Sequence, residues 1–187
     1  SSVLLVSSMY LVGCSGNSGC DSLYTSGYVA KGLIKNAKVC IDENINFECD
    51  SNETFTKTNE KGYYSFDRLV TYPLIIVLDL ESFDTSLQQS YSLVLYSPSV
   101  SENNSSRRDV TMFSSLATIT ARENNISIEA ANKIVAQKFD QNESVIMGNF
   151  IDNPALTQAQ KDEIESAASF ALQLIRLALT KVNNVSD

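Results

Sequence analysis

The chain contains neither histidine nor tryptophan among its 187 residues. Without histidine there can be no Ser-His-Asp triad, no Cys-His pair and no histidine-ligated zinc site. The chain also lacks the side chain that most often exchanges protons near neutral pH. These absences exclude the commonest kinds of hydrolase and zinc-enzyme site.

Basic residues are also scarce, since 14 Lys and Arg face 22 Asp and Glu, for a formal net charge of −8. A nucleic-acid partner needs a basic stripe that neutralises phosphates, so none is expected. There is no Gly-rich phosphate loop and no nucleophile elbow. Asp79, Glu81 and Asp84 lie close in sequence, but nothing sets two of them across a cleft as a glycosidase requires. We therefore expect a protein that is not an enzyme.

The stretch from Asp42 to Glu53 carries oxygen-bearing side chains at its first, third, fifth, seventh, ninth and twelfth positions. Calcium takes about six to eight oxygen ligands, and this spacing is that of a calcium-binding loop closed by a bidentate Glu. The sixth position, usually Gly, is Phe47. The alternative is a polar, solvated turn between two strands. The predicted Ca²⁺ ligands are Asp42, Asn44, Asn46, Glu48, Asp50 and Glu53.

Residues 2–14 form an apolar run that is too short to cross a bilayer as a helix and fits an export signal. The run ends in Leu-Val-Gly-Cys at Cys14 and resembles a bacterial lipoprotein signal. The resemblance implies cleavage before Cys14, a lipid anchor on its sulfur, and export to the outer membrane or cell surface. Residues 15–26, rich in Gly and Ser, are then a tether. The alternative keeps residues 1–13 as a buried first strand.

Export implies an oxidising compartment, in which disulfides persist. Cys40 and Cys49 flank the first part of the predicted calcium loop, and a disulfide between them would restrict the loop before metal binds. Four cysteines allow three pairings, and the sequence does not choose among them. If Cys14 carries no lipid, Cys20 is its natural partner.

Between residues 27 and 100, short segments of alternating or unbroken apolar character are separated by turn residues. Such a pattern is typical of an all-β, Ig-like sandwich. The unbroken run at residues 74–78 indicates a central strand. The predicted strands are residues 28–34, 37–41, 54–58, 63–66, 74–78 and 91–96.

Two motifs in this region carry a family resemblance. The run Ala-x-Val-Cys-Ile-Asp-x-Asn-x-Asn from Ala37, followed by Thr-x-Thr-Asn-Glu-x-Gly-x-Tyr-x-Phe from Thr56, resembles a prealbumin-like, carboxypeptidase-regulatory-like sandwich. It is also similar to the calcium-binding B-type repeats of serine-aspartate-repeat surface proteins. The resemblance implies a sandwich whose loop binds calcium. Those repeats have Gly where this chain has Phe47, and often use a backbone carbonyl at the position of Glu48.

After the turn-rich residues 98–108 the apolar period becomes helical, and we predict an α-helical region over residues 109–187. Ser127 is a good N-cap for a helix that runs to Phe139, with Ile134 on its buried stripe. Thr157 and Gln160 form a capping box that opens a further helix ending near residue 181.

Several asparagines lie in Asn-x-Ser/Thr sequences, and four of these have an acidic residue two places earlier. This extended form resembles the acceptor of bacterial N-glycosylation, which is expected on surface loops. The four are Asn52, Asn104, Asn125 and Asn142.

These features predict a non-catalytic, membrane-anchored surface module with a structural or adhesive role, a calcium-stabilised loop and a surface protein or glycan as partner. An alternative is an accessory module that binds glycan or peptide, for which Tyr63, Tyr72, Tyr91 and Tyr96 are the plentiful source of aromatic faces. A third possibility is a filament subunit whose N-terminal strand adds to the sheet edge of a neighbour.

Overall fold

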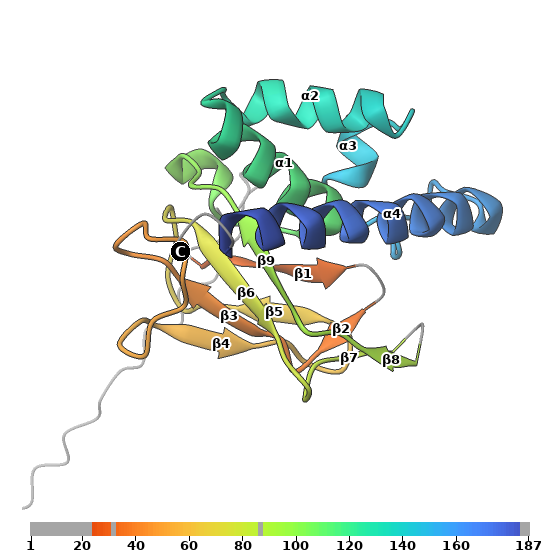
Figure 1. Ribbon diagram of the computed structural model, residues 1–187. Helices are drawn as coiled ribbons and strands as arrows, with labels where there is room; N and C mark the ends of the chain where they lie inside the picture. The colour runs from red at the N-terminus through yellow and green to blue at the C-terminus, as the bar shows by residue number, and fades with distance from the viewer. Residues whose placement is uncertain (1–23, 31–32, 86–87, 184–187) are drawn as a thin grey trace, which may run out of the picture.

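Figure 1 shows the computed structural model, which describes residues 24–30, 33–85 and 88–183. Within these ranges, short strands occupy the first part of the chain and helices the second. The helices lie together as a layer on one side of the strands (Figure 1). The prediction of a β-rich region followed by an α-helical region is therefore confirmed.

The largest sheet has four antiparallel strands in the order β4-β3-β6-β9. Strand β6 (Leu74–Leu78) pairs with β3 (Lys38–Ile41) on one side and with β9 (Leu93–Ser97) on the other. The unbroken apolar run therefore forms a central strand, as predicted. Strand β4 (Phe55–Lys57) is the free edge next to β3.

The second sheet, in the order β10-β1-β5, joins the two ends of the β-rich region. Strand β1 (Ser26–Ala30) pairs antiparallel with β5 (Tyr63–Ser65) and parallel with β10 (Val110–Thr111). The parallel pairing brings the chain back beside β1 just before helix α1 begins. The paired residues are far apart in the sequence, so local sequence patterns do not predict this pairing.

A third, small sheet was not predicted. The sequence suggested one strand over residues 28–34, but β1 ends at Ala30 and a separate strand starts at Ile34. The strands of this third sheet are only two residues long, so they leave no periodic signal in the sequence. They are β2 (Ile34–Lys35), β7 (Phe83–Asp84) and β8 (Gln89–Ser90), paired in that order.

Two of the helices begin at the capping residues predicted for them. Ser127 accepts a hydrogen bond from the backbone N–H of Ala130 at 3.2 Å, and the backbone N–H of Thr157 donates to Gln160 Oε1 at 2.9 Å. Helix α1 starts at a capping box of Thr111 with Ser114. The helical elements are a short 3-10 turn at Glu102–Asn104, α1 (Met112–Asn124), α2 (Ile128–Lys138), α3 (Glu143–Ile146) and α4 (Gln158–Asn183).

The two faces of the four-stranded sheet bury different residues. Val39, Ile76 and Leu95 lie opposite one another across β3, β6 and β9 and point into the main core, which the helices share. The neighbouring row of Cys40 and Ile75 points to the other face, where a small second cluster forms around Tyr96. Alternation along each strand therefore separates one large core from one small one.

Two apolar residues that were predicted to be at least partly buried are exposed to solvent. Phe55, expected in a half-buried strand, is 52% exposed, because it lies on the edge strand, shares the face of Cys40 that points away from the main core, and is not part of the small cluster there. Ile134 is 47% exposed, since α2 packs mainly on α1 and α3 and leaves its far side in solvent.

Candidate metal-binding loop

The predicted calcium loop connects β3 to the edge strand β4. The predicted disulfide between Cys40 and Cys49 is present, with 5.7 Å between the two Cα atoms. It ties the last part of β3 to the middle of the loop, across 9 residues of sequence. The loop is thus closed by a covalent bond whether or not a metal binds.

Asp42 organises the first half of the loop from a buried position. Its side chain is fully buried, and its two carboxylate oxygens accept hydrogen bonds from the backbone N–H groups of Asn46 and Phe47, at 3.1 and 2.9 Å. A buried carboxylate is costly unless it is paired in this way. These two bonds bend the loop back over the end of β3.

Asn44, Asn46 and Asp50 form the centre of the loop. The amide nitrogens of both asparagines donate to the same oxygen of Asp50, Oδ2, at 2.8 and 2.9 Å. Their amide oxygens accept from backbone N–H groups two residues further on, at 3.1 and 2.8 Å. Two N–H donors, each with a partial positive charge, therefore converge on one oxygen of the Asp50 carboxylate.

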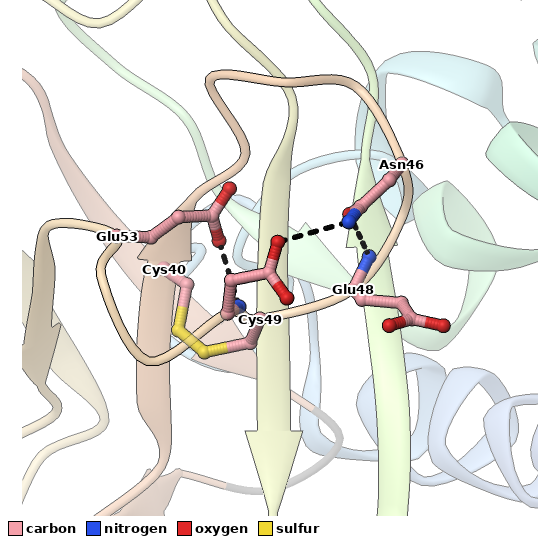
Figure 2. Close-up of a disulfide and its surroundings, with 6 residues drawn as sticks. Cys40, Asn46, Glu48, Cys49 and Glu53 are labelled. Atoms are coloured by element: carbon pink, nitrogen blue, oxygen red, sulfur yellow. Dashed lines mark hydrogen bonds between the residues drawn. A yellow bond between two sulfur atoms is a disulfide. The ribbon is translucent and has the colours of Figure 1, made fainter.

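Glu53 closes the loop by a hydrogen bond to the backbone of Asp50. Its Oε2 accepts the backbone N–H of Asp50 at 3.1 Å, whereas its Oε1 is buried and has no hydrogen-bond partner in the described part of the chain. Glu48 is exposed, and its carboxylate extends away from Glu53 (Figure 2). Five of the six predicted ligand residues are therefore linked by hydrogen bonds within the loop, and the Glu48 side chain is not among them.

Phe47 occupies the position that Gly usually takes, and it adopts the backbone that Gly favours, with φ +65°. A left-handed conformation costs a residue with a side chain about 1–2 kcal/mol. Ile45 is also left-handed, with φ +59°, although it is β-branched. The loop thus holds two unfavourable backbone conformations next to the residues that would bind metal.

The side chain of Phe47 connects the loop to the rest of the fold. Its ring lies 6.3 Å from the ring of Tyr96 on β9, and the guanidinium of Arg122 in α1 lies 4.2 Å from its centroid. Burial raises the pKa of the Tyr96 hydroxyl, and the nearby Arg122 acts in the opposite direction. Contacts to residues 49 and 75 positions away could not be read from the loop sequence.

Carboxylates alone do not make a metal site here. Among residues 24–30, 33–85 and 88–183, no three His, Cys, Asp or Glu side chains lie close enough together to hold a metal ion. The donor set that the loop offers is mixed, with asparagine amides beside Asp42, Asp50 and Glu53. Asparagine oxygens are ordinary calcium ligands. Rotating each amide by half a turn would bring its oxygen toward Asp50, and would give up the hydrogen bond that this oxygen accepts from the backbone.

The carboxylates that follow β6 have structural partners. Asp79 accepts the backbone N–H groups of Glu81 and Ser82, at 2.9 and 3.2 Å, and so caps the turn before β7. Glu81 forms an exposed ion pair with Lys57 at 3.2 Å. Asp84 is fully buried.

Of the other predicted sites, some lie among the described residues and some lie outside them. Cys14 and Cys20 lie outside the described residues. The four predicted glycosylation acceptors are all exposed, which an acceptor requires, although the side chain of Asn142 also caps α3. No helix in the portion of the chain described by the structure has the length and apolar character needed to cross a membrane.

Comparison of the chain with protein-family models, with curated proteins and with solved structures finds no match.

Proposed function

We propose that this protein is a non-catalytic, exported surface module whose Asp42–Glu53 loop binds calcium as a structural ion. The observation that carries the proposal is the Glu53 carboxylate, which accepts the backbone N–H of Asp50 with one of its two oxygens. One oxygen of Asp50 collects two amide donors, and one buried oxygen of Glu53 has no donor in the part of the chain that the structure describes. A buried, unpaired carboxylate oxygen is costly, and a bound cation would satisfy this oxygen of Glu53.

In this proposal the asparagine amides take the place of the metal when calcium is absent. Asn44 and Asn46 hold the Asp50 carboxylate with their Nδ2 groups and keep the loop in shape. On binding, the same side chains turn their oxygens inward, and calcium supplies the positive charge. Asp50 and Glu53 would contribute carboxylates first, Asp42 would join them only if the loop closes further and its bonds to Asn46 and Phe47 open, and residue 48 has its backbone carbonyl to offer.

Phe47 gives calcium binding a consequence for the whole fold. Because its ring contacts β9 and α1, an ordered loop is held against the junction of the four-stranded sheet and the helices. Calcium would therefore stiffen that junction. A module of this kind suits a structural or adhesive role.

Export and membrane anchoring belong to the same proposal. The Cys40–Cys49 disulfide supports it, because structural disulfides persist in oxidising compartments. The anchor would be the lipid expected on Cys14. We further propose that the two larger sheets form the prealbumin-like sandwich that the sequence resembles. Support comes from apolar side chains of both sheets, such as Val29 and Ile76, that share the main core.

The test is a thermal melt of the protein in calcium and then in excess chelator. A ligand present at about one hundred times its dissociation constant adds about 2.7 kcal/mol to the free energy of unfolding. For a chain of this size that corresponds to a rise in Tm of about 5–10 °C. Identical melting temperatures in millimolar calcium and in chelator would contradict the proposal.

Three conservative variants locate the site. Asp50→Asn and Glu53→Gln keep the size of each side chain and remove its charge, so the calcium-dependent rise in Tm should disappear. Glu48→Gln is the matched control, because its carboxylate extends away from the loop (Figure 2). If Glu48→Gln abolished the rise and Asp50→Asn did not, the proposed ligand set would be wrong.

A further inference from the structure

A shallow groove of about 730 Å³ lies between the edge strands β4 and β5. Each strand belongs to a different sheet, and the short turn that joins them leaves their outer sides facing the same space. Aromatic rings and small polar side chains line this groove together. Its main contributors are Tyr24, Thr54, Phe55, Tyr63, Ser65 and Asp67.

Two aromatic side chains stand open to solvent in the groove. Tyr24 is 46% exposed and Phe55 is 52% exposed. The ammonium group of Lys38 lies 4.5 Å from the centroid of the Phe55 ring and occupies one of its sides. The rest of the Phe55 ring therefore offers an apolar surface that no folding contact requires, and Tyr63 adds a half-buried ring nearby.

The polar groups of the groove are hydroxyls and a single carboxylate. Thr54 and Ser65 are exposed, and Asp67 adds an exposed carboxylate. Among the described residues that line the groove there is no lysine or arginine. The Lys38 ammonium beside the groove is stacked on the Phe55 ring, and the whole chain has a net charge of −8, so an anionic ligand is disfavoured. The lining suits an uncharged ligand that has both apolar faces and hydroxyl groups.

A peptide strand added to these edges fits less well. Residue 54 bonds to β3 and residue 58 to residues 36 and 37 just before it, so the backbone groups of Phe55 and Lys57 point outward. However, β4 is only three residues long and Lys57 is ion-paired on it. On β5, both outward backbone groups of Tyr63 already bond to Asn59, at 2.9 and 3.1 Å. Short, charged or occupied edges are the usual protection against strand addition.

We infer that the groove between β4 and β5 binds a neutral oligosaccharide. Sugar rings carry apolar C–H faces that pack on aromatic rings such as those of Tyr24 and Phe55. Their hydroxyls would donate to the Asp67 carboxylate and exchange hydrogen bonds with Thr54 and Ser65. None of the residues that line this groove is a proposed calcium ligand, although Thr54 directly follows Glu53.

The experiment measures binding of four neutral hexasaccharides to the whole protein in calcium-containing buffer. The probes are cellohexaose, hexa-N-acetylchitohexaose, maltohexaose and mannohexaose. Saturation-transfer difference NMR detects weak binding, and tyrosine fluorescence follows it independently because the chain has no tryptophan. We expect at least one probe to bind, with saturation strongest on ring C–H protons. If none of the four binds, the inference is overturned.

Variants place the binding in the groove. Phe55→Ala and Tyr24→Ala should each weaken binding about tenfold, the scale of losing one stacked ring. Asp67→Asn should weaken it without removing an aromatic ring. Tyr72→Ala is the matched control, since Tyr72 is 44% exposed and does not line the groove. A melt of each variant shows that it is folded.

Two further outcomes would overturn the inference. If Tyr72→Ala weakened binding as much as Phe55→Ala, the site would not be this groove. If the protein instead self-associated with rising concentration, Phe55→Ala abolished that association and no saccharide bound, the groove would be a contact between chains. Calcium-dependent melting is unaffected by either result, so the calcium proposal is judged separately.

Discussion

Replacing Phe47 by alanine and by glycine separates two effects that this residue combines. The ring packs on Tyr96 and under Arg122, while the backbone is held at φ +65°. Alanine removes the ring and keeps the backbone cost. Glycine removes the ring and the backbone cost together. The stability lost in Phe47→Ala therefore measures the contacts of the ring, and the difference between the two variants measures the cost of the left-handed backbone.

The expected magnitudes follow from the contacts of the ring. Losing about half the burial of a Phe side chain costs about 1 kcal/mol. The aromatic pair adds about 0.5–1.5 kcal/mol, and an exposed guanidinium over a ring about 0.5–1 kcal/mol. Phe47→Ala should thus lower the free energy of unfolding by about 2–3.5 kcal/mol. Phe47→Gly should be about 0.5–1 kcal/mol more stable than the alanine variant, because relief of the left-handed backbone exceeds the entropy cost of glycine.

The assay is urea denaturation of both variants in chelator, so that metal binding does not contribute. Arg122→Ala, made in the native chain and in the Phe47→Ala background, is the control. It should destabilise the native chain and have almost no effect once the ring is gone. If Phe47→Gly were less stable than Phe47→Ala, residue 47 would not adopt the left-handed conformation, and the proposed reason for tolerating Phe there would fail.

Two further predictions concern buried polar side chains, namely Arg108 and the tyrosines Tyr64 and Tyr91. Arg108 is 4% exposed and its guanidinium donates to four acceptors, so Arg108→Met should lower the free energy of unfolding by about 3 kcal/mol or more, seen as a lower urea midpoint at unchanged slope. An unchanged midpoint would contradict this. Burial raises the pKa of Tyr64 and raises that of Tyr91 to about 12. Since unfolded tyrosine loses its proton near pH 10, stability should be constant below about pH 10 and fall above it, less steeply in Tyr64→Phe. Denaturation from pH 8 to 12 checks this, and an equal decline in both proteins would refute the role of Tyr64.

The sequence by itself determined the local features of this protein. The helix caps at Ser127 and Thr157 and the central strand β6 were predictable, and Cys40–Cys49 was the expected disulfide among three pairings that the sequence left open. Each depends on residues within a few positions of one another, through hydrogen bonds, period or chain closure. The oxygen spacing of the loop was also readable, because alternate residues must supply ligands to one point.

Only the tertiary structure decided how those pieces face each other. The exposure of Phe55 depends on its pairing with Cys40, and the parallel pairing of β1 with β10 joins residues about eighty positions apart. The sequence could not explain Phe47 in place of Gly, because its ring is held by Tyr96 and Arg122 from distant elements. Side-chain environment on a sheet or loop is set by whichever segments pack against it, and those segments leave no signal in the local sequence.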